Sequence, residues 1–390
     1  MSTESLLQLS ESVLFISFFI YLVAIIPLGL SIKSKKRVYS YAGISLTLIG
    51  FILQLIYFGA RWSVAGHAPV SNLYEFMTFF GIMLIAGFLL IFFMYRQTII
   101  GLFTIPLSLI ILGYASAFSS EVSPLIPALQ SNWLTIHVMT VAFASAVLSI
   151  AFVTSVLYLL KTSVPDKKNK SNFFLELVMY ALVVVCGFII STTFFGMVGE
   201  EHAFQFQNKD DVTEIYEYTM YPITVPNQSE VINDGSQTGL VELPVYIDSH
   251  KVNTLLWSFI IGTILYILMR LITRRKVITL LKPITNKLDA SLMDEISHRT
   301  IVIGFPLFAL GGLVFAMIWA QMAWTRFWGW DPKEVWALIT FLVYAVYLHL
   351  RLNDKWTPQK AAWVSIIGFA TIIFNQVFVN LVIAGLHSYA

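Results

Sequence analysis

Charged residues are scarce in this sequence of 390 residues. Asp, Glu, Lys and Arg together make up 12% of it, and hydrophobic residues make up 57%, whereas a soluble domain carries about 25% charged residues. This shortage excludes an ordinary soluble domain and predicts an integral membrane protein. The formal net charge of +2 says nothing about partners, because charge in a membrane protein is distributed by side. We expect no nucleic-acid partner.

Cysteine is nearly absent. The single cysteine, Cys186, lies inside the apolar stretch VVVCGFII. One cysteine excludes an internal disulfide and a CxxC redox pair. Any thiol chemistry that the protein serves must therefore involve the cysteines of a partner.

Apolar runs of about 20 residues recur along the chain, and each can cross a hydrocarbon core about 30 Å thick. Helices are predicted because a membrane forces the backbone to satisfy its own hydrogen bonds. The first run is preceded by Glu4 and Glu11 and by no basic residue, so we expect a retained helix and not a cleaved signal peptide. The ten expected spans are roughly 12–31, 39–59, 73–95, 98–118, 133–160, 173–197, 253–272, 300–319, 334–351 and 360–383.

Basic residues gather on one side of these spans. Nineteen of the 24 Lys and Arg lie on the side where the odd-numbered spans end, in segments such as Lys33–Arg37 and Arg274–Lys276. The positive-inside rule assigns that side to the cytoplasm. Both termini are therefore expected to be extracytoplasmic.

One acidic segment interrupts this pattern. Residues 199–252 hold ten Asp or Glu and two basic residues, with strand-like pieces such as LPVYI; the pattern does not decide between a small extracytoplasmic domain and a flexible loop. Residues 273–299 are basic and amphipathic and predict an interfacial helix. The expected fold is an all-α polytopic membrane protein, with a five-helix part over 1–170, a two-helix insert over 171–272 and a three-helix part over 273–390.

Tryptophan is concentrated in one stretch, WAQMAWTRFWGWDPKEVW, which holds five of the ten tryptophans. Its DPKE segment is a good helix start, with Asp331 as the N-cap and Glu334 completing a capping box. Interfacial anchoring explains one or two indoles at a helix end, but not five in one connection. The five rings predict one flat apolar platform on the outer face that binds haem, a quinone or an isoprenoid lipid. They belong to Trp319, Trp324, Trp328, Trp330 and Trp336.

Histidines narrow this choice. His137 lies about one turn into the fifth span, and His387 follows the tenth. A lone histidine near a helix end is usually an interfacial hydrogen-bonding residue, but two neutral imidazoles beside aromatic rings are what bis-axial ligation of haem iron requires. His349, toward the inner end of the ninth span, is either part of an interhelical hydrogen bond or a metal ligand whose second ligand comes from a partner chain.

Several stretches together resemble a known family. The tryptophan stretch is similar to the "WWD" signature of the haem-handling proteins of cytochrome c assembly, and the chain most resembles the CcsA or ResC subunits of System II cytochrome c synthases. Further matches are GHAPVSNLYEF (Gly66–Phe76), LQSNWLTIHV (Leu129–Val138), YLHLR (Tyr347–Arg351) and GLHSY (Gly385–Tyr389). The resemblance covers most of the chain.

The resemblance implies that haem b, the bound substrate, reaches the outer face. There its vinyl groups become attached to the CxxCH cysteines of apocytochrome c. His137 and His387 would be the axial ligands of the iron, and His349 a transient ligand during transit.

The resemblance also assigns the indoles. Those that present the vinyl edge, together with a carboxylate, would be Trp324, Trp328, Trp330 and Asp331, and Trp319 and Trp336 would complete the haem-binding surface. A small residue, usually glycine, is expected after Trp324, where this chain has Thr325 and then Arg326. The arginine could meet a haem propionate.

The expected partners are a ResB/CcsB-like membrane subunit, apocytochrome c, membrane lipid and, indirectly, thiol-reducing proteins. The resemblance implies a subunit of holocytochrome c synthase. We expect it in the bacterial cell membrane, in preference to the plastid thylakoid, because no transit peptide precedes the first span. The resemblance assigns no role to the insert over 171–272, which shorter family members lack. Two other functions remain open: haem export and handover without ligation, as in CcmC-like proteins, and lipid-linked glycosyl transfer.

Overall fold

The protein is an integral membrane protein built mainly of helices. The computed structural model describes residues 2–34, 36–122, 125, 127–165, 167–199, 201–207, 213–232, 239–245, 247–353 and 355–379. Within these residues, ten helices are long and apolar enough to cross a membrane, which confirms the predicted number of spans. The first and eighth spans begin about ten residues earlier than predicted.

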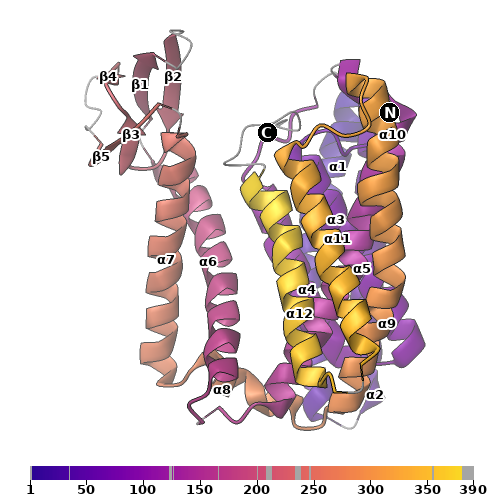
Figure 1. Cartoon of the computed structure of the whole chain (residues 1–390). Helices are drawn as coiled ribbons and strands as arrows, with labels where there is room; N and C mark the ends of the chain where they lie inside the picture. The colour runs from indigo at the N-terminus through magenta and orange to yellow at the C-terminus, as the bar shows by residue number, and fades with distance from the viewer. Residues whose placement is uncertain are drawn as a thin grey trace. The chain divides into compact units, whose positions relative to one another are not determined.

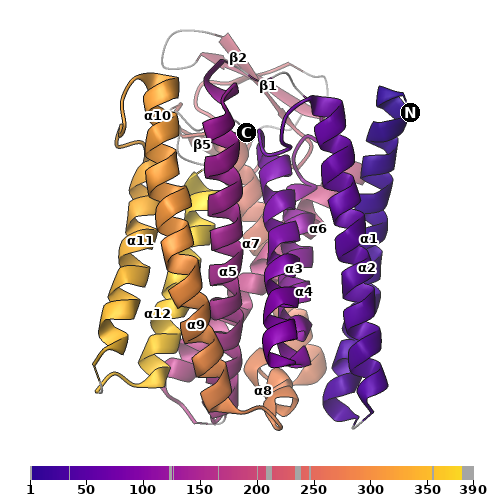
Figure 2. The same cartoon turned by 90° about the vertical axis from the view of Figure 1, so that its right-hand side faces the viewer.

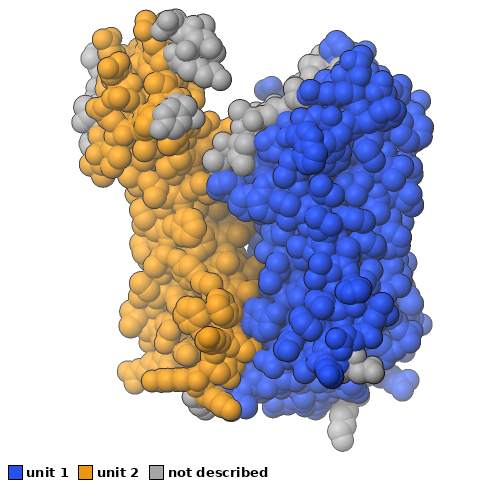
Figure 3. All heavy atoms as spheres, viewed as in Figure 1, with its two compact units in different colours: residues 1–164, 281–390 blue, residues 165–280 orange. Residues whose placement is uncertain are grey.

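The chain divides into two compact units, shown in different colours in Figure 3. Unit 1 comprises Met1–Val164 and Leu281–Ala390, and unit 2 comprises Pro165–Leu280. The elements of unit 1 are α1 (Thr3–Lys33), α2 (Arg37–Ala65), α3 (Leu73–Tyr95), α4 (Thr98–Ala115), η1 (Pro127–Leu129), α5 (Asn132–Thr162), η2 (Lys282–Thr285), α9 (Ala290–Ala309), η3 (Leu310–Phe315), α10 (Ala316–Trp324), α11 (Pro332–Arg351), α12 (Pro358–Ile373) and η4 (Phe374–Val379).

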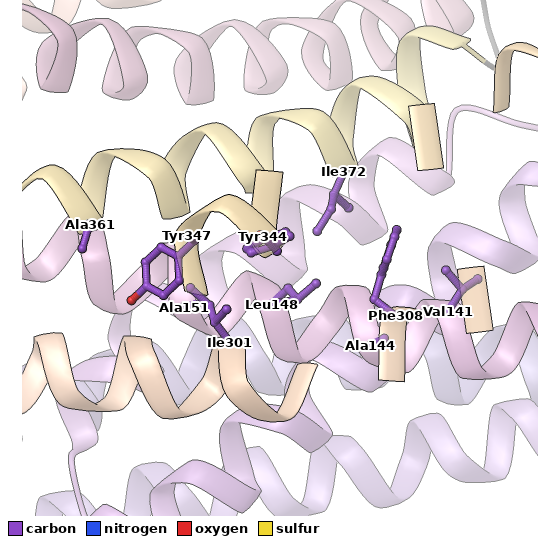
Figure 4. Close-up of a cluster of buried hydrophobic side chains, with 10 residues drawn as sticks. All are labelled: Val141, Ala144, Leu148, Ala151, Ile301, Phe308, Tyr344, Tyr347, Ala361 and Ile372. Atoms are coloured by element: carbon purple, nitrogen blue, oxygen red, sulfur yellow. The ribbon is translucent and has the colours of Figure 1, made fainter. Parts of the chain in front are cut away.

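The central helix of unit 1 is α5. In its most apolar window 89% of the residues are buried, against 28% for α1. It packs against α3, α9 and α12, and Figure 2 shows it between α9 and α3. Figure 4 shows the core that it forms with α9, α11 and α12, in which alanines such as Ala144 and Ala151 let large rings such as Tyr344 and Tyr347 approach the helix closely.

The eighth span is one long rod made of α9, η3 and α10. Because α9 begins at Ala290, the predicted interfacial helix over 273–299 is wrong in its second half. Met293, Ile296 and Ser297 are buried, and the Ser297 hydroxyl lies 3.0 Å from that of Ser155 on α5. This amphipathic face covers a neighbouring helix and not the membrane surface.

Unit 2 contains α6 (Lys170–Val198), α7 (Ser249–Thr273) and most of α8 (Val277–Leu281). A Cβ on Gly187 would lie 2.5 Å from the backbone nitrogen of Gly262, so the α6–α7 pair needs glycine at this crossing. The acidic segment adds strands that the sequence left undecided. β1 (His202–Gln207) lies antiparallel between β2 (Thr213–Tyr218) and β4 (Glu230–Val231), and β3 (Thr224–Pro226) is parallel to β5 (Val241–Leu243).

One end of unit 1 carries the connection between α10 and α11, and we call it the tryptophan end. The start of α1 lies at this end, as do the end of α12 and the start of α5 (Figures 1 and 2). Residues far apart in the sequence therefore meet here.

Candidate functional site

His137, near the start of α5, is oriented by contacts with the span made of α9, η3 and α10. Its Nδ1 lies 2.8 Å from the carbonyl oxygen of Gly311. Its ring is stacked on Trp319 with an interplanar angle of 9° and a centroid separation of 5.8 Å. In a neutral imidazole, a hydrogen bond from Nδ1–H leaves the lone pair on Nε2, which is the arrangement found in metal-ligating histidines.

The carbonyl that holds His137 belongs to a π-helical segment, η3. Such wide turns interrupt the ordinary hydrogen-bond ladder and are frequent at functional sites. A Cβ on Gly311 would lie 2.6 Å from the backbone nitrogen of Val141 and 2.9 Å from the carbonyl carbon of Thr140. Glycine is therefore required for η3 to approach α5 closely enough for the Gly311 carbonyl to accept a hydrogen bond from His137.

A cavity opens beside His137. It encloses about 140 Å³, and the wider hollow, including space open to solvent, measures about 1040 Å³. Both π-helical segments border it, η3 through Gly312 and η4 through Asn375 and Gln376. Its walls are mainly apolar, with Phe76, Leu129, Leu134, Val138, Val141, Phe308, Ala337 and Ile372 among them.

The five tryptophans do not form the single flat platform that the sequence predicted. Trp319 is buried and lines the cavity, and Trp324 meets it edge-on at 4.7 Å and 64°. Trp336 packs at 4.1 Å against Phe374 of η4.

The remaining two indoles lie in the connection between the helices. Trp328 and Trp330 are nearly perpendicular to each other, at 86° and 5.9 Å, and Trp330 is 70% exposed. Within the described part of the chain, Trp319 is the one member of the five that lines the cavity.

Asp331 and Glu334 form the predicted capping box at the start of α11, which is confirmed. Asp331 Oδ2 accepts from the backbone N–H of Lys333 at 3.2 Å. Glu334 Oε2 accepts from the N–H of Gly329 at 2.8 Å and of Asp331 at 3.1 Å. Both carboxylates are buried and hold the turn that carries Trp328 and Trp330.

A buried ion pair holds the opposite wall. Arg61 Nε lies 2.8 Å from Glu75 Oε1, with both side chains at most 1% exposed. Arg61 also donates to the carbonyl of Ser120 at 2.7 Å, and Glu75 Oε2 accepts from the N–H and hydroxyl of Ser71 at 2.9 and 2.8 Å. Through Glu75 the pair anchors Ser71, which lines the cavity. Removing one partner of such a buried pair costs about 3–5 kcal/mol.

The structure does not bring every predicted ligand to the cavity. His349 is exposed in the last turn of α11. Nearby, Arg351 forms a two-pronged pair with Asp294, at 3.1 and 2.9 Å. His387 lies outside the described residues.

Sequence reasoning missed the polar residues of the cavity wall, Lys333 and Asn375 above all. Lys333 stands beside the recognised Asp331, and its carbonyl accepts from Asn375 Nδ2 at 3.3 Å. The available signal was the position of Lys333 as the second residue of a helix that begins directly after the tryptophan-rich connection. A side chain at that position lies close to any site that the connection covers.

The sequence has clear relatives. The profile of a family described as "Cytochrome C assembly protein" matches residues 70–224 and 255–387. The cytochrome c biogenesis protein CcsA of Guillardia theta is 27% identical over 380 residues, which cover 96% of this chain and 94% of that protein. The CcsA of Rippkaea orientalis is 30% identical over 353 residues (89% and 86%), and that of Prochlorococcus marinus 29% over 392 residues (99% and 96%).

Ten helices that can span a membrane, with an imidazole and an indole beside a mainly apolar cavity at one end of unit 1, define a class of polytopic membrane proteins with an apolar ligand site. The chain belongs to the cytochrome c assembly protein family, is of the CcsA type within it, and serves cytochrome c biogenesis. The alignments over 96–99% of the chain run across residues 171–272.

Proposed function

We propose that this protein binds haem b beside His137 at the outer face of the membrane and presents it for covalent attachment to apocytochrome c. The observation that carries the proposal is the position of His137. Its ring is stacked on Trp319, its Nδ1 is bonded to the Gly311 carbonyl, and it lines a mainly apolar cavity. Iron ligation needs such a neutral, oriented imidazole, and a porphyrin needs apolar walls.

The second axial ligand in this proposal is His387, which the family resemblance suggests. Two histidine ligands hold the porphyrin plane at a defined angle and influence the potential of the iron. This matters because the attachment reaction uses reduced haem and reduced thiols.

Attachment itself is an addition. The S–H of each CxxCH cysteine adds across a vinyl C=C, so that an S–C bond forms, the double bond becomes single, and the thiol proton passes to the other vinyl carbon. No oxidant is consumed. The protein contributes mainly by holding haem and peptide together, which turns an encounter of two molecules into an oriented reaction. Trp324, Trp328, Trp330 and Asp331 belong to or border the exposed turn where the peptide would arrive.

His349 supports a role for a partner subunit. It is exposed on a membrane-spanning helix, where a polar ring is costly unless another group meets it. A ResB/CcsB-like subunit could supply that group and a second ligand for haem in transit. The assembly would then be a holocytochrome c synthase of the haem lyase type in the bacterial cell membrane, with thiol-reducing proteins acting on its peptide substrate.

The test replaces His137 or His387 with glycine in the protein purified with its partner subunit. We expect each change to alter or abolish the haem absorption spectrum, and added imidazole to restore it by occupying the space left by the ring. His250→Gly, at the start of α7 in unit 2, is the matched control. Unchanged spectra in both His137→Gly and His387→Gly would reject the two residues as ligands.

Two alternatives predict other outcomes. A haem-handover protein would bind haem through His137 but would leave a co-expressed CxxCH peptide unmodified with or without the partner. A lipid-linked glycosyl transferase would purify without haem absorbance and would need a divalent metal. The capping-box contacts of Asp331 and Glu334 disfavour this second alternative, because both carboxylates already bind backbone N–H groups.

The proposed orientation has its own test. A cysteine at Thr325, in a Cys186→Ser background, should react in intact cells with a thiol reagent that does not cross membranes. A cysteine at Lys355, beyond the other end of α11, should react only after the membrane is opened. The reverse pattern would place the site on the cytoplasmic side.

A further inference from the structure

Lys333 is a charged residue on the cavity wall that the capping box does not use. It is the second residue of α11 and lines the cavity together with His137 and Trp319. Its backbone is fixed at both ends, since its N–H donates to Asp331 Oδ2 at 3.2 Å and its carbonyl accepts from Asn375 Nδ2 at 3.3 Å. The side chain therefore starts from a well-defined point at the cavity.

The ammonium group has no partner of its own within the part of the chain that the structure describes. No carboxylate lies within ion-pair distance of it, and it donates no hydrogen bond there. The other charged side chain of the lining, Glu334, is engaged by the N–H groups of Gly329 and Asp331. The cavity wall thus carries an ammonium group that forms no ion pair among the described residues and lies between mainly apolar walls, an arrangement that favours the entry of an anion.

We propose that Lys333 binds a carboxylate of the haem. This rests on the proposed function above and adds to it the edge by which the porphyrin enters. Haem carries its two propionates on one side of the ring and its vinyl groups elsewhere on the rim. A carboxylate at Lys333 would also lie near the N-terminus of the 20-residue helix α11, where the helix dipole favours negative charge.

This contact selects one orientation of the ring. With the propionates directed to Lys333 inside the cavity, the vinyl-bearing part of the rim is left for the exposed turn of Trp328 and Trp330. Arg326, the other cation of this region, is exposed and lies over Gly329, and the cavity lining does not include it among the described residues. Lys333 is therefore the better candidate.

The experiment compares haem with its dimethyl ester, which keeps the iron and the vinyl groups but has no free carboxylates. Wild-type protein, purified with its partner and stripped of haem, is titrated with each ligand and the absorption of the His137-bound form is followed. A charge-assisted hydrogen bond is worth about 1.5–3 kcal/mol, so we expect the wild type to bind haem about 10- to 140-fold more tightly than the ester.

Lys333→Met should bind haem as weakly as the ester and should bind the ester as the wild type does. Lys333→Arg should recover most of the preference. Lys355→Met, in an exposed position beyond the other end of α11, is the matched control and should behave as wild type. If Arg326→Met, and not Lys333→Met, removes the preference, the assignment to Lys333 is wrong.

The outcomes separate this inference from the function on which it rests. If the wild type shows no His137-dependent spectrum with either ligand, the proposed haem site is wrong. If the wild type binds both ligands through His137 with equal affinity, only the role of Lys333 is overturned. That comparison uses unmodified protein, so it holds even if Lys333→Met fails to fold.

Discussion

The tryptophan stretch contains two regions with opposite properties. Trp319, at its beginning, is 1% exposed and stacked on His137, whereas Trp330, near its end, is 70% exposed. The first region is helical and packs against α5, whereas the second is a turn whose Gly329 and Asp331 N–H groups are bound by Glu334 of the capping box. One continuous motif thus has a part that can hold a ligand and a part that can meet another molecule.

The backbone shows the same contrast. Thr325 and Trp330 bracket the turn, and both adopt left-handed conformations, with φ of 57° and 56°. Such a conformation costs about 1–2 kcal/mol for a residue other than glycine. The exposed region is therefore strained, and the buried capping carboxylates offset that strain. The following five changes test the contrast, from the largest expected effect to the smallest.

Trp319→Ala should produce the largest loss. Removing a buried indole costs about 3–5 kcal/mol, and it also takes away the surface against which the His137 ring lies. We expect a lower melting temperature in detergent and a weakened haem spectrum. If haem binding is unchanged, the stacking does not orient the ligand.

Gly311→Val should separate η3 from α5. The added Cβ meets backbone atoms that cannot move away as a side chain could, and overpacking of this kind costs about 1–3 kcal/mol. We expect loss of stability together with loss of the His137-dependent spectrum. Gly59→Ala on α2 is the control, because no atom lies within 4 Å of its added Cβ; an equal loss there would refute the explanation.

Two substitutions at Asp331 distinguish its role as a helix cap from the effect of its negative charge. Asp331→Ala removes the N-cap and should cost about 1 kcal/mol, whereas asparagine is an equally good cap. If Asp331 only holds the turn, Asp331→Asn should keep both the melting temperature and cytochrome c attachment. Loss of attachment at unchanged stability in Asp331→Asn would show that the charge itself takes part.

Thr325→Gly should stabilise the protein. Glycine adopts a left-handed helix C-cap without steric cost, so the gain is expected to be about 1 kcal/mol, seen as a higher melting temperature. It also restores the small residue that the family resemblance led us to expect after Trp324. A lower melting temperature would mean that the threonine side chain makes a contact worth more than the strain.

Trp330→Ala should hardly change stability, by about 0.5 kcal/mol or less, because the side chain is largely exposed. We expect the haem spectrum to remain and attachment to a CxxCH peptide to fall. If attachment is unaffected, the exposed region does not receive the peptide.

Some of these features could be predicted from the sequence. The spans follow from apolar run length, and the capping box follows from the order Asp-Pro-Lys-Glu. These depend on local chemistry that neighbouring residues determine. The proximity of His137 to an indole was also expected, because both were predicted to lie at the outer ends of their spans.

Other features could not be predicted in this way. The π-helical segments LGGLVF and FNQVFV have no distinct sequence pattern, since a widened turn depends on what packs beside it. The hydrogen bond between His137 and the Gly311 carbonyl joins residues 174 positions apart. The prediction of a flat platform was wrong because the number of tryptophans in a stretch does not determine the angles between their rings. Lys333 was overlooked because its neighbour Asp331 explained the motif as a helix cap.

The widened turn in η3 has a consequence for length. An ordinary helix turns by about 100° for each residue. The one additional residue in a π-helical turn therefore changes the direction in which all side chains after that turn point. Deleting one residue between Leu310 and Phe315 would leave a span still long enough to cross the bilayer, yet it would point Trp319 away from α5. The shortened protein would still insert into the membrane, but its site beside His137 would be lost.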